Sequence, residues 1–126
     1  MAPVTLFLAA VSGFLAVGLG AFGAHGLRDR FDAYSMGVFE TAVQYQMYHS
    51  LALLGVGVLL LHAPGSALLR ASAVLFCLGI VIFSGSLYVL SFSGLRWLGA
   101  ITPLGGLAFL AAWACLAVAA WSLKPS

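Results

Sequence analysis

The sequence predicts an all-α fold: a polytopic membrane protein, one domain over residues 1–126, built as a bundle of four transmembrane helices. Two observations predict it. The chain is 63% hydrophobic and only 6% charged, whereas soluble domains average about 45–50% apolar and about 25% charged residues. Long apolar runs also recur four times, each close to the about 20 residues that cross a bilayer. This composition excludes a disordered chain, a nucleic-acid-binding protein and a disulfide-rich scaffold.

The first expected span is Thr5–Ala24. A signal peptide is the alternative, but no Lys or Arg precedes Arg28, so we expect the span to be retained. Residues 18–23 read GLGAFG and match GxGxxG, yet a dinucleotide site also needs a strand and a soluble sheet. The small residues predict instead a groove that a neighbouring helix can approach closely. The expected packing positions are Ala16, Gly20, Gly23 and Ala24.

Residues 26–42 carry five of the eight formal charges and predict a polar loop or an interfacial helix between the first two spans. His25, just before them, is expected to cap the first helix through its dipole. If the N-terminus lies outside, Arg28, Arg30 and Arg96 are cytoplasmic, whereas Arg70 and Lys124 are not. That balance favours an N-out, C-out orientation.

The second expected span, Val43–Leu61, carries polar side chains along half its length. Only Leu51–Leu61 is uninterrupted apolar sequence, and its length of about 16 Å is half the hydrocarbon thickness. The preceding polar groups therefore lie at membrane depth, where we expect them to face protein or trapped water. Helical spacing groups them into a polar seam. Its members are Glu40, Thr41, Gln44, Tyr45, Tyr48 and His49.

The seam has two interpretations. One is a path for a proton or solute, with His49 as the titratable element because His changes charge near neutral pH. The other is a closed hydrogen-bond network that fixes helix register and orientation. We favour the closed network because nothing in the residues demonstrates transport.

The third and fourth expected spans are Ala67–Leu90 and Leu98–Trp121, and they offer partners for the seam. Pro103 is expected to kink the fourth span and free a carbonyl, with a packing site or a hinge as the two readings. Trp97 and Trp121, about 36 Å apart along a helix, match the two aromatic interface belts. The candidate hydroxyls are Ser84, Ser86, Tyr88 and Thr102, and the candidate packing residues are Gly85, Pro103, Gly105 and Gly106.

The sequence offers no catalytic constellation, and we expect neither an enzyme nor a cofactor. The three His residues are His25, His49 and His62; by the span count two of them lie at opposite interfaces, which disfavours a metal site. Cys77 and Cys115 fall in apolar runs, where thiols act as small packing groups.

Motifs in each expected span resemble the domain-of-unknown-function 423 family of bacterial inner-membrane proteins, which is similar to animal transmembrane protein 256. They are GAFGAH at 20–25, QYQ at 44–46, HSLA at 49–52, FSGSLY at 83–88 and TPLGG at 102–106, followed by Phe109, Leu110 and Trp113. The resemblance implies a retained first span, four crossings and a location in the bacterial cytoplasmic membrane. It implies no particular activity.

These observations predict a small inner-membrane protein that works through packing or assembly. The expected partners are membrane lipids and a second copy of the chain or another membrane protein, and no nucleic acid. One alternative is a small channel or proton-linked transporter that uses the seam. A second is a protein that binds a quinone or a lipid in a cleft beside the seam.

Overall fold

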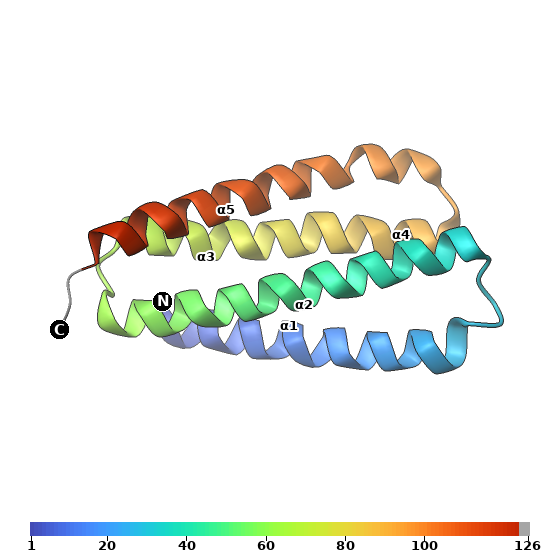
Figure 1. The fold of residues 1–126 in the computed structure, drawn as a ribbon, viewed down its shortest axis with the longest axis horizontal. Coiled ribbons are helices and arrows are strands. Elements are labelled where there is room, and N and C mark those ends of the chain that lie inside the picture. The colour runs from blue at the N-terminus through green and yellow to red at the C-terminus, as the bar shows by residue number, and fades with distance from the viewer. Residues whose placement is uncertain (124–126) are drawn as a thin grey trace.

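The computed structural model describes residues 1–123, and Figure 1 shows that they form four long helical segments arranged side by side. No strand occurs within that range, so the all-α prediction is confirmed. In chain order the elements are α1 (Ala2–Phe22), the π-helical turn η1 (Gly23–Leu27), α2 (Ala33–His62), α3 (Ala67–Gly79), the π-helical turn η2 (Ile80–Ser84), α4 (Gly85–Ser93), the 3-10 helix η3 (Arg96–Ala100) and α5 (Thr102–Ser122).

The segments alternate in direction, because short connections join each helix to the next at the same end of the bundle. The N-terminus and the end of α5 therefore lie at one end, and the 28–32 linker lies at the other (Figure 1). Helix α1 packs chiefly on α2, and α3 chiefly on α5. Helix α2 joins these two pairs through its contacts with α3, η2 and α4.

Three helical stretches are long and apolar enough to cross a membrane: Ala2–Leu27, Ala67–Ser93 and Arg96–Ser122. They contain the first, third and fourth expected spans. Helix α2 has 30 residues, or about 45 Å of helix, but its N-terminal half is more polar. The position of Lys124, expected just beyond the fourth span, lies outside the described residues.

The polar loop predicted between the first two spans is limited to residues 28–32, and the rest of the polar segment is helical. Helix α2 begins at Ala33 and runs without interruption through the predicted boundary at Val43. Asp32 starts it as an N-cap, where its side chain accepts a hydrogen bond from the Ser35 amide at 2.7 Å. That bond, with a smaller contribution from Arg96, holds the pKa of Asp32 below its ordinary value of 3.8.

Pro103 does not kink a membrane-spanning helix, contrary to the sequence prediction. It lies in the first turn of α5, where a proline costs no helical hydrogen bond because the first amides have no partner within the helix. The preceding 3-10 helix η3 carries Trp97, which is 62% exposed, and Trp121 is 93% exposed at the other end of α5. The two rings thus mark opposite ends of the bundle.

Glycines allow the closest helix contacts of the core. A Cβ on Gly105 would lie 2.5 Å from the backbone nitrogen of Phe83, and one on Gly79 would lie 2.3 Å from the Phe109 ring. A third such glycine, Gly57 on α2, adjoins the Leu6 side chain on α1. These three positions seat α5 on α3 and η2, and α1 on α2.

The segment from α3 to α4 is one continuous helix that contains the π-helical turn η2. Before the turn, buried residues recur every one to four positions up to Gly79; the next is Ser84, five positions later. A π turn inserts one extra residue into an α-helix. It therefore keeps one buried face along the whole segment, formed by Leu69, Ser72, Ala73, Phe76, Gly79, Ser84, Ser86, Leu87, Leu90 and Ser91.

Candidate functional site

The interior polar network of the bundle is centred on Gln46 of α2. This side chain is 4% exposed; its Nε2 donates to the carbonyl of Ser12 at 2.8 Å, and its Oε1 accepts from the Tyr88 hydroxyl at 2.6 Å. Ser50, one turn further along, places its Oγ 2.6 Å from the Ser12 hydroxyl and 2.6 Å from the Gln46 carbonyl. The network thus ties α1, α2 and α4 together.

His49 is the buried titratable residue of α2, and aromatic rings surround it. Its Nδ1 lies 2.7 Å from the Tyr45 carbonyl; a carbonyl only accepts, so Nδ1 carries a proton and neutral His49 keeps its lone pair on Nε2. The imidazole stacks on Phe109 with ring centroids 3.5 Å apart and an angle of 7°. Phe76 and Trp113 lie beside it at 5.8 and 6.0 Å.

The predicted polar seam does not lie on one side of α2. Of its six members only His49 is buried, and Thr41 is intermediate, with its hydroxyl donating to the Gly37 carbonyl of its own helix. Glu40, Gln44, Tyr45 and Tyr48 are exposed. These polar groups are expected to face protein or trapped water, and in this chain taken alone a carboxylate, an amide and two phenols lie on the outer surface.

The candidate hydroxyls of the third and fourth segments bond to neighbouring backbone or to one another. Ser84 donates to the Ala42 carbonyl of α2 at 2.8 Å. The Ser86 and Thr102 hydroxyls lie 2.6 Å apart and join α4 to α5. With Tyr88 bound to Gln46, these four residues hold helices together, and none of them contacts the seam's exposed members by a hydrogen bond in the described residues.

The predicted packing residues divide into close contacts and open positions. Ala16 is 1% exposed, and a Cβ on Gly23 would lie 2.5 Å from Phe39. A Cβ on Gly20 would lie 3.3 Å from Val43. A Cβ on Gly85 or Gly106 meets nothing within 4 Å, and Ala24 is exposed.

Residue spacing missed the centre of the polar network. Gln46 and Ser50 lie on a different face of α2 from the predicted stripes, and Ser12 stands alone in an apolar run. Helical periodicity sorts side chains into faces, but it does not state which face is inside when both carry polar groups. The short apolar run after Ser50 was the signal that this half of the helix had polar contacts to make.

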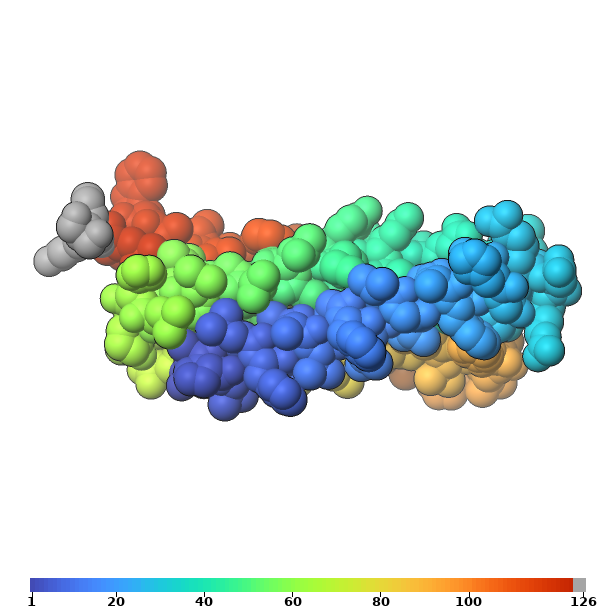
Figure 2. Space-filling view, turned by 90° about the horizontal axis from the view of Figure 1, so that it is seen from below, coloured from blue at the N-terminus to red at the C-terminus, as the bar shows by residue number. Residues whose placement is uncertain are grey.

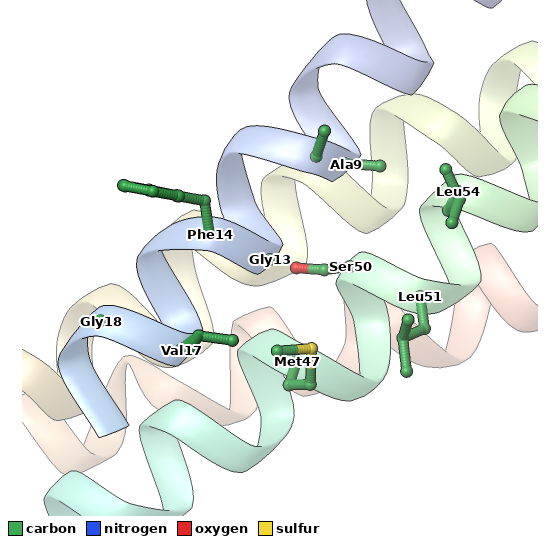
Figure 3. Close-up of a pocket in the computed structure, with 10 residues that line it drawn as sticks. Ala9, Gly13, Phe14, Val17, Gly18, Met47, Ser50, Leu51 and Leu54 are labelled. Atoms are coloured by element: carbon green, nitrogen blue, oxygen red, sulfur yellow. The ribbon is translucent and has the colours of Figure 1, made fainter. Parts of the chain in front are cut away.

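A groove runs between α1 and α2 on the side of the molecule away from α3. Its wider part, a cavity of about 560 Å³, is lined by small and apolar residues of both helices. Figure 3 shows Gly13 on α1 opposite Ser50 on α2, and Val17 extending toward Met47. Figure 2 shows the two helices, blue and green, lying along each other at the surface.

Next to it along the same two helices, toward the charged linker, lies a second cavity of about 200 Å³. On α2 the residues that line the cavities change from the apolar Met47 to the polar Gln44 and Glu40. Opposite α2, the second cavity is lined by Ala24 and Arg28. Both charged side chains are exposed. Neither makes a hydrogen bond or an ion pair to another described residue.

The described residues contain no cluster of three or more His, Cys, Asp or Glu that could hold a metal ion. Cys77 and Cys115 are free, half-buried thiols. The chemical features that the described residues offer are an apolar groove with charges beside one end, the Nε2 of His49 and the exposed amide of Gln44.

Comparison with known proteins gives relatives along almost the whole chain. The "UPF0382 membrane protein YwdK" of Bacillus subtilis is 48% identical over 117 residues, which cover 93% of this chain and 95% of the relative. The "UPF0382 inner membrane protein YgdD" of Escherichia coli is 47% identical over 119 residues, 94% of this chain and 90% of the relative. No solved structure matches the chain.

A family model described as "Protein of unknown function (DUF423)" matches residues 19–106. This stretch includes the π-helical turns, the polar network apart from Ser12, and the start of α5. The family resemblance noted in the sequence is confirmed. The names of the relatives also agree with the prediction of a membrane protein. The chain belongs to the DUF423 family of membrane proteins.

Proposed function

We propose that this protein crosses the bacterial inner membrane four times and acts, without catalysis, by assembling with a second copy of itself. The observation that carries the proposal is the outer face of α2, which exposes Gln44, Tyr45 and Tyr48. Polar groups that face hydrocarbon are costly, and a partner helix removes the cost.

Contacts with α1 support a four-crossing topology with this outer face at membrane depth. Val43 adjoins Gly20, and Ser50 adjoins Ser12, so Gln44 lies beside the end of the apolar α1 and Tyr48 nearer its middle. Helix α2 also has to connect the Arg28 end of the bundle with the opposite end, where α3 begins (Figure 1). At about 45 Å it is longer than the about 30 Å hydrocarbon core.

A second copy is the partner that the chemistry of Gln44 favours. A primary amide carries both donors and an acceptor, so two Gln44 amides related by a two-fold axis satisfy each other with a pair of hydrogen bonds. The aromatic faces of Tyr45 and Tyr48, with ring centroids 5.8 Å apart, add contact area beside that pair.

Native mass spectrometry of the full chain in lipid nanodiscs tests the proposal. We expect a dimer for the natural sequence, and monomers when Gln44→Leu and Tyr48→Leu are combined. Phe7→Leu is the matched control, since Phe7 is 66% exposed on the outer face of α1 and should leave the dimer intact. A protein that stays monomeric at every protein-to-lipid ratio refutes self-assembly.

Cysteine cross-linking locates the interface. With Cys77 and Cys115 replaced by serine, a single cysteine at Gln44→Cys should form an intermolecular disulfide on oxidation. A cysteine at Phe7→Cys should not, and efficient cross-linking at that position alone would contradict the proposed face.

The orientation that we propose is N-out, C-out. Arg96 stacks 4.1 Å over the Tyr34 ring, which places it at the same end as Arg28 and Arg30, so three arginines share one side of the membrane. The positive-inside rule assigns that side to the cytoplasm. Labelling of Asp29→Cys from the inside, and of Gly65→Cys from the outside, is the expected result.

A channel or proton-linked transporter has less support. Transport requires a continuous path, but Gln46 and Ser50 bond within the bundle, and the ring of Phe109 covers His49. We expect liposomes that contain the protein to show no pH-dependent flux above that of empty liposomes. His49→Ala should leave this result unchanged. A flux that depends on His49 would restore the transporter.

A further inference from the structure

We infer that the groove between α1 and α2 is a binding site for one phospholipid with a primary-amine head group. This site goes beyond self-assembly, although Gln44 lines the groove as well as the proposed dimer face. The groove combines an apolar body with a charged end, and the two parts are arranged as a lipid is: acyl chains in the membrane and a head group at its surface.

The two cavities follow one another along α1 and α2. Their α2 lining residues recur every three or four positions, which places them on one face of the helix. On the facing side, the residues that line the wide cavity run from Ala9 to Gly18 of α1. Those that line the second cavity run from Gly20 of α1 to Arg28 of the linker. The α2 positions are Met36, Phe39, Glu40, Val43, Gln44, Met47, Ser50, Leu51 and Leu54.

The dimensions fit a lipid. From Glu40 to Leu54 the groove follows about 21 Å of helix, which exceeds the about 15 Å depth of one leaflet of the hydrocarbon core. The wide cavity of about 560 Å³ is within the range of ordinary ligand pockets, about 300–1,000 Å³. Gly13 and Gly18 keep it open, because no atom lies within 4 Å of a Cβ placed on either.

The charges at the end of the groove select the head group. Arg28 and Glu40 line the narrow cavity from its two sides. A guanidinium binds phosphate oxygens with paired hydrogen bonds, and a carboxylate accepts hydrogen bonds from a primary ammonium. Together they match a head group that carries a phosphate and an amine. A quaternary ammonium has no N–H to donate to Glu40, and a glycerol head group has no positive charge.

Native mass spectrometry of the full chain with an equimolar mixture of phosphatidylethanolamine, phosphatidylcholine and phosphatidylglycerol tests the site. We expect one retained lipid per chain, with phosphatidylethanolamine retained about tenfold more than either other lipid. Glu40→Gln should remove that preference, and Arg28→Gln should lower the retention of all three lipids. Equal retention of the three by the natural sequence overturns the assignment.

Matched variants separate the site from general effects of charge. Asp29→Asn and Arg30→Gln remove neighbouring charges that do not line the groove, and they should leave the selectivity unchanged. A loss of selectivity in these variants as large as in Glu40→Gln and Arg28→Gln would show general surface electrostatics and overturn the site.

Filling the groove tests its apolar part. Gly13→Leu, and independently Gly18→Leu, place a side chain in the open cavity and should abolish lipid retention while the helical circular dichroism stays unchanged. Gly55→Leu is the control, because its Cβ also meets nothing within 4 Å and Gly55 lies outside the groove. Lipid retained by both filled variants overturns the proposal.

The same samples distinguish this site from the dimer. The double variant Gln44→Leu, Tyr48→Leu should form no dimers. The Gly13→Leu chain should still dimerise in lipid nanodiscs, as measured by native mass spectrometry. If Gly13→Leu and Gly18→Leu instead dissociate the dimer, a helix of the second copy occupies the groove, and the lipid assignment is overturned while self-assembly stands.

Discussion

Replacing Gly105 with alanine should destabilise the bundle, whereas the same change at the adjacent Gly106 should not. A Cβ on Gly105 would lie 2.5 Å from the backbone nitrogen of Phe83 and 2.8 Å from its Cα. Backbone atoms cannot rotate away as a side chain can, so α5 and η2 must separate. A Cβ on Gly106 meets nothing within 4 Å.

The pair of variants isolates the cost of this contact. In both, alanine gains the same helix propensity over glycine, about 0.5–1 kcal/mol, and the term cancels in the comparison. Inserting a methyl group into a packed site typically costs about 1–3 kcal/mol. Gly105→Ala should therefore be less stable than Gly106→Ala by about 1–3 kcal/mol, or about 5- to 150-fold in the folding equilibrium.

Reversible unfolding in mixed micelles, followed by circular dichroism as the fraction of denaturing detergent rises, measures the difference. Gly106→Ala should equal or exceed the natural protein in stability. If the two variants unfold at the same detergent fraction, the close approach of α5 to Phe83 is absent and the reasoning fails.

Three further changes test other parts of the structure. Gln46→Leu and Tyr88→Phe, singly and together, should show a coupling energy of about 0.6 kcal/mol in a double-mutant cycle, the average for side-chain hydrogen bonds inside a membrane; no coupling would contradict the bond. Gly57→Ala should lower stability less than Gly105→Ala, because its Cβ meets chiefly a flexible leucine, while Gly55→Ala, facing open space, should be neutral in the same unfolding assay. The stabilisation from Asp32 is complete above its ordinary pKa of 3.8 and is lost as pH falls through its lowered folded pKa, so Asp32→Asn should flatten the acid decline in thermal stability, and an unchanged decline would refute the cap.

Composition and hydropathy were sufficient to predict the all-helical fold, because the requirement to satisfy backbone groups in lipid leaves few alternatives. The start of α2 was harder. Residues 33–42 are polar enough to read as a linker, yet the Asp32 cap and the contacts of Phe39 with Tyr88 and Phe92 hold them in the helix. These contacts join segments about 50 positions apart, and local sequence does not contain them.

The candidate site was predicted in its composition and not in its arrangement. His49 and Tyr88 are buried or half-buried, as expected of polar groups that contact protein, but the partner of Tyr88 is Gln46, on a face that spacing alone did not favour. Pro103 shows the same limit. Whether a proline kinks a helix or begins one depends on where the first turn of the helix lies, and after the 3-10 helix η3 the helix α5 begins at Thr102.

The π-helical turn at Ile80–Ser84 has a consequence for changes in chain length. Elsewhere in a packed helix, loss of one residue rotates everything beyond it by about 100° and carries buried side chains to the surface. Within 80–84 the same loss would convert the π turn to ordinary α-helix, with Gly79 and Ser84 then four positions apart. A single-residue deletion here should therefore leave both halves of the segment facing α2 and α5, which makes this turn a point in the bundle that accommodates a shorter chain.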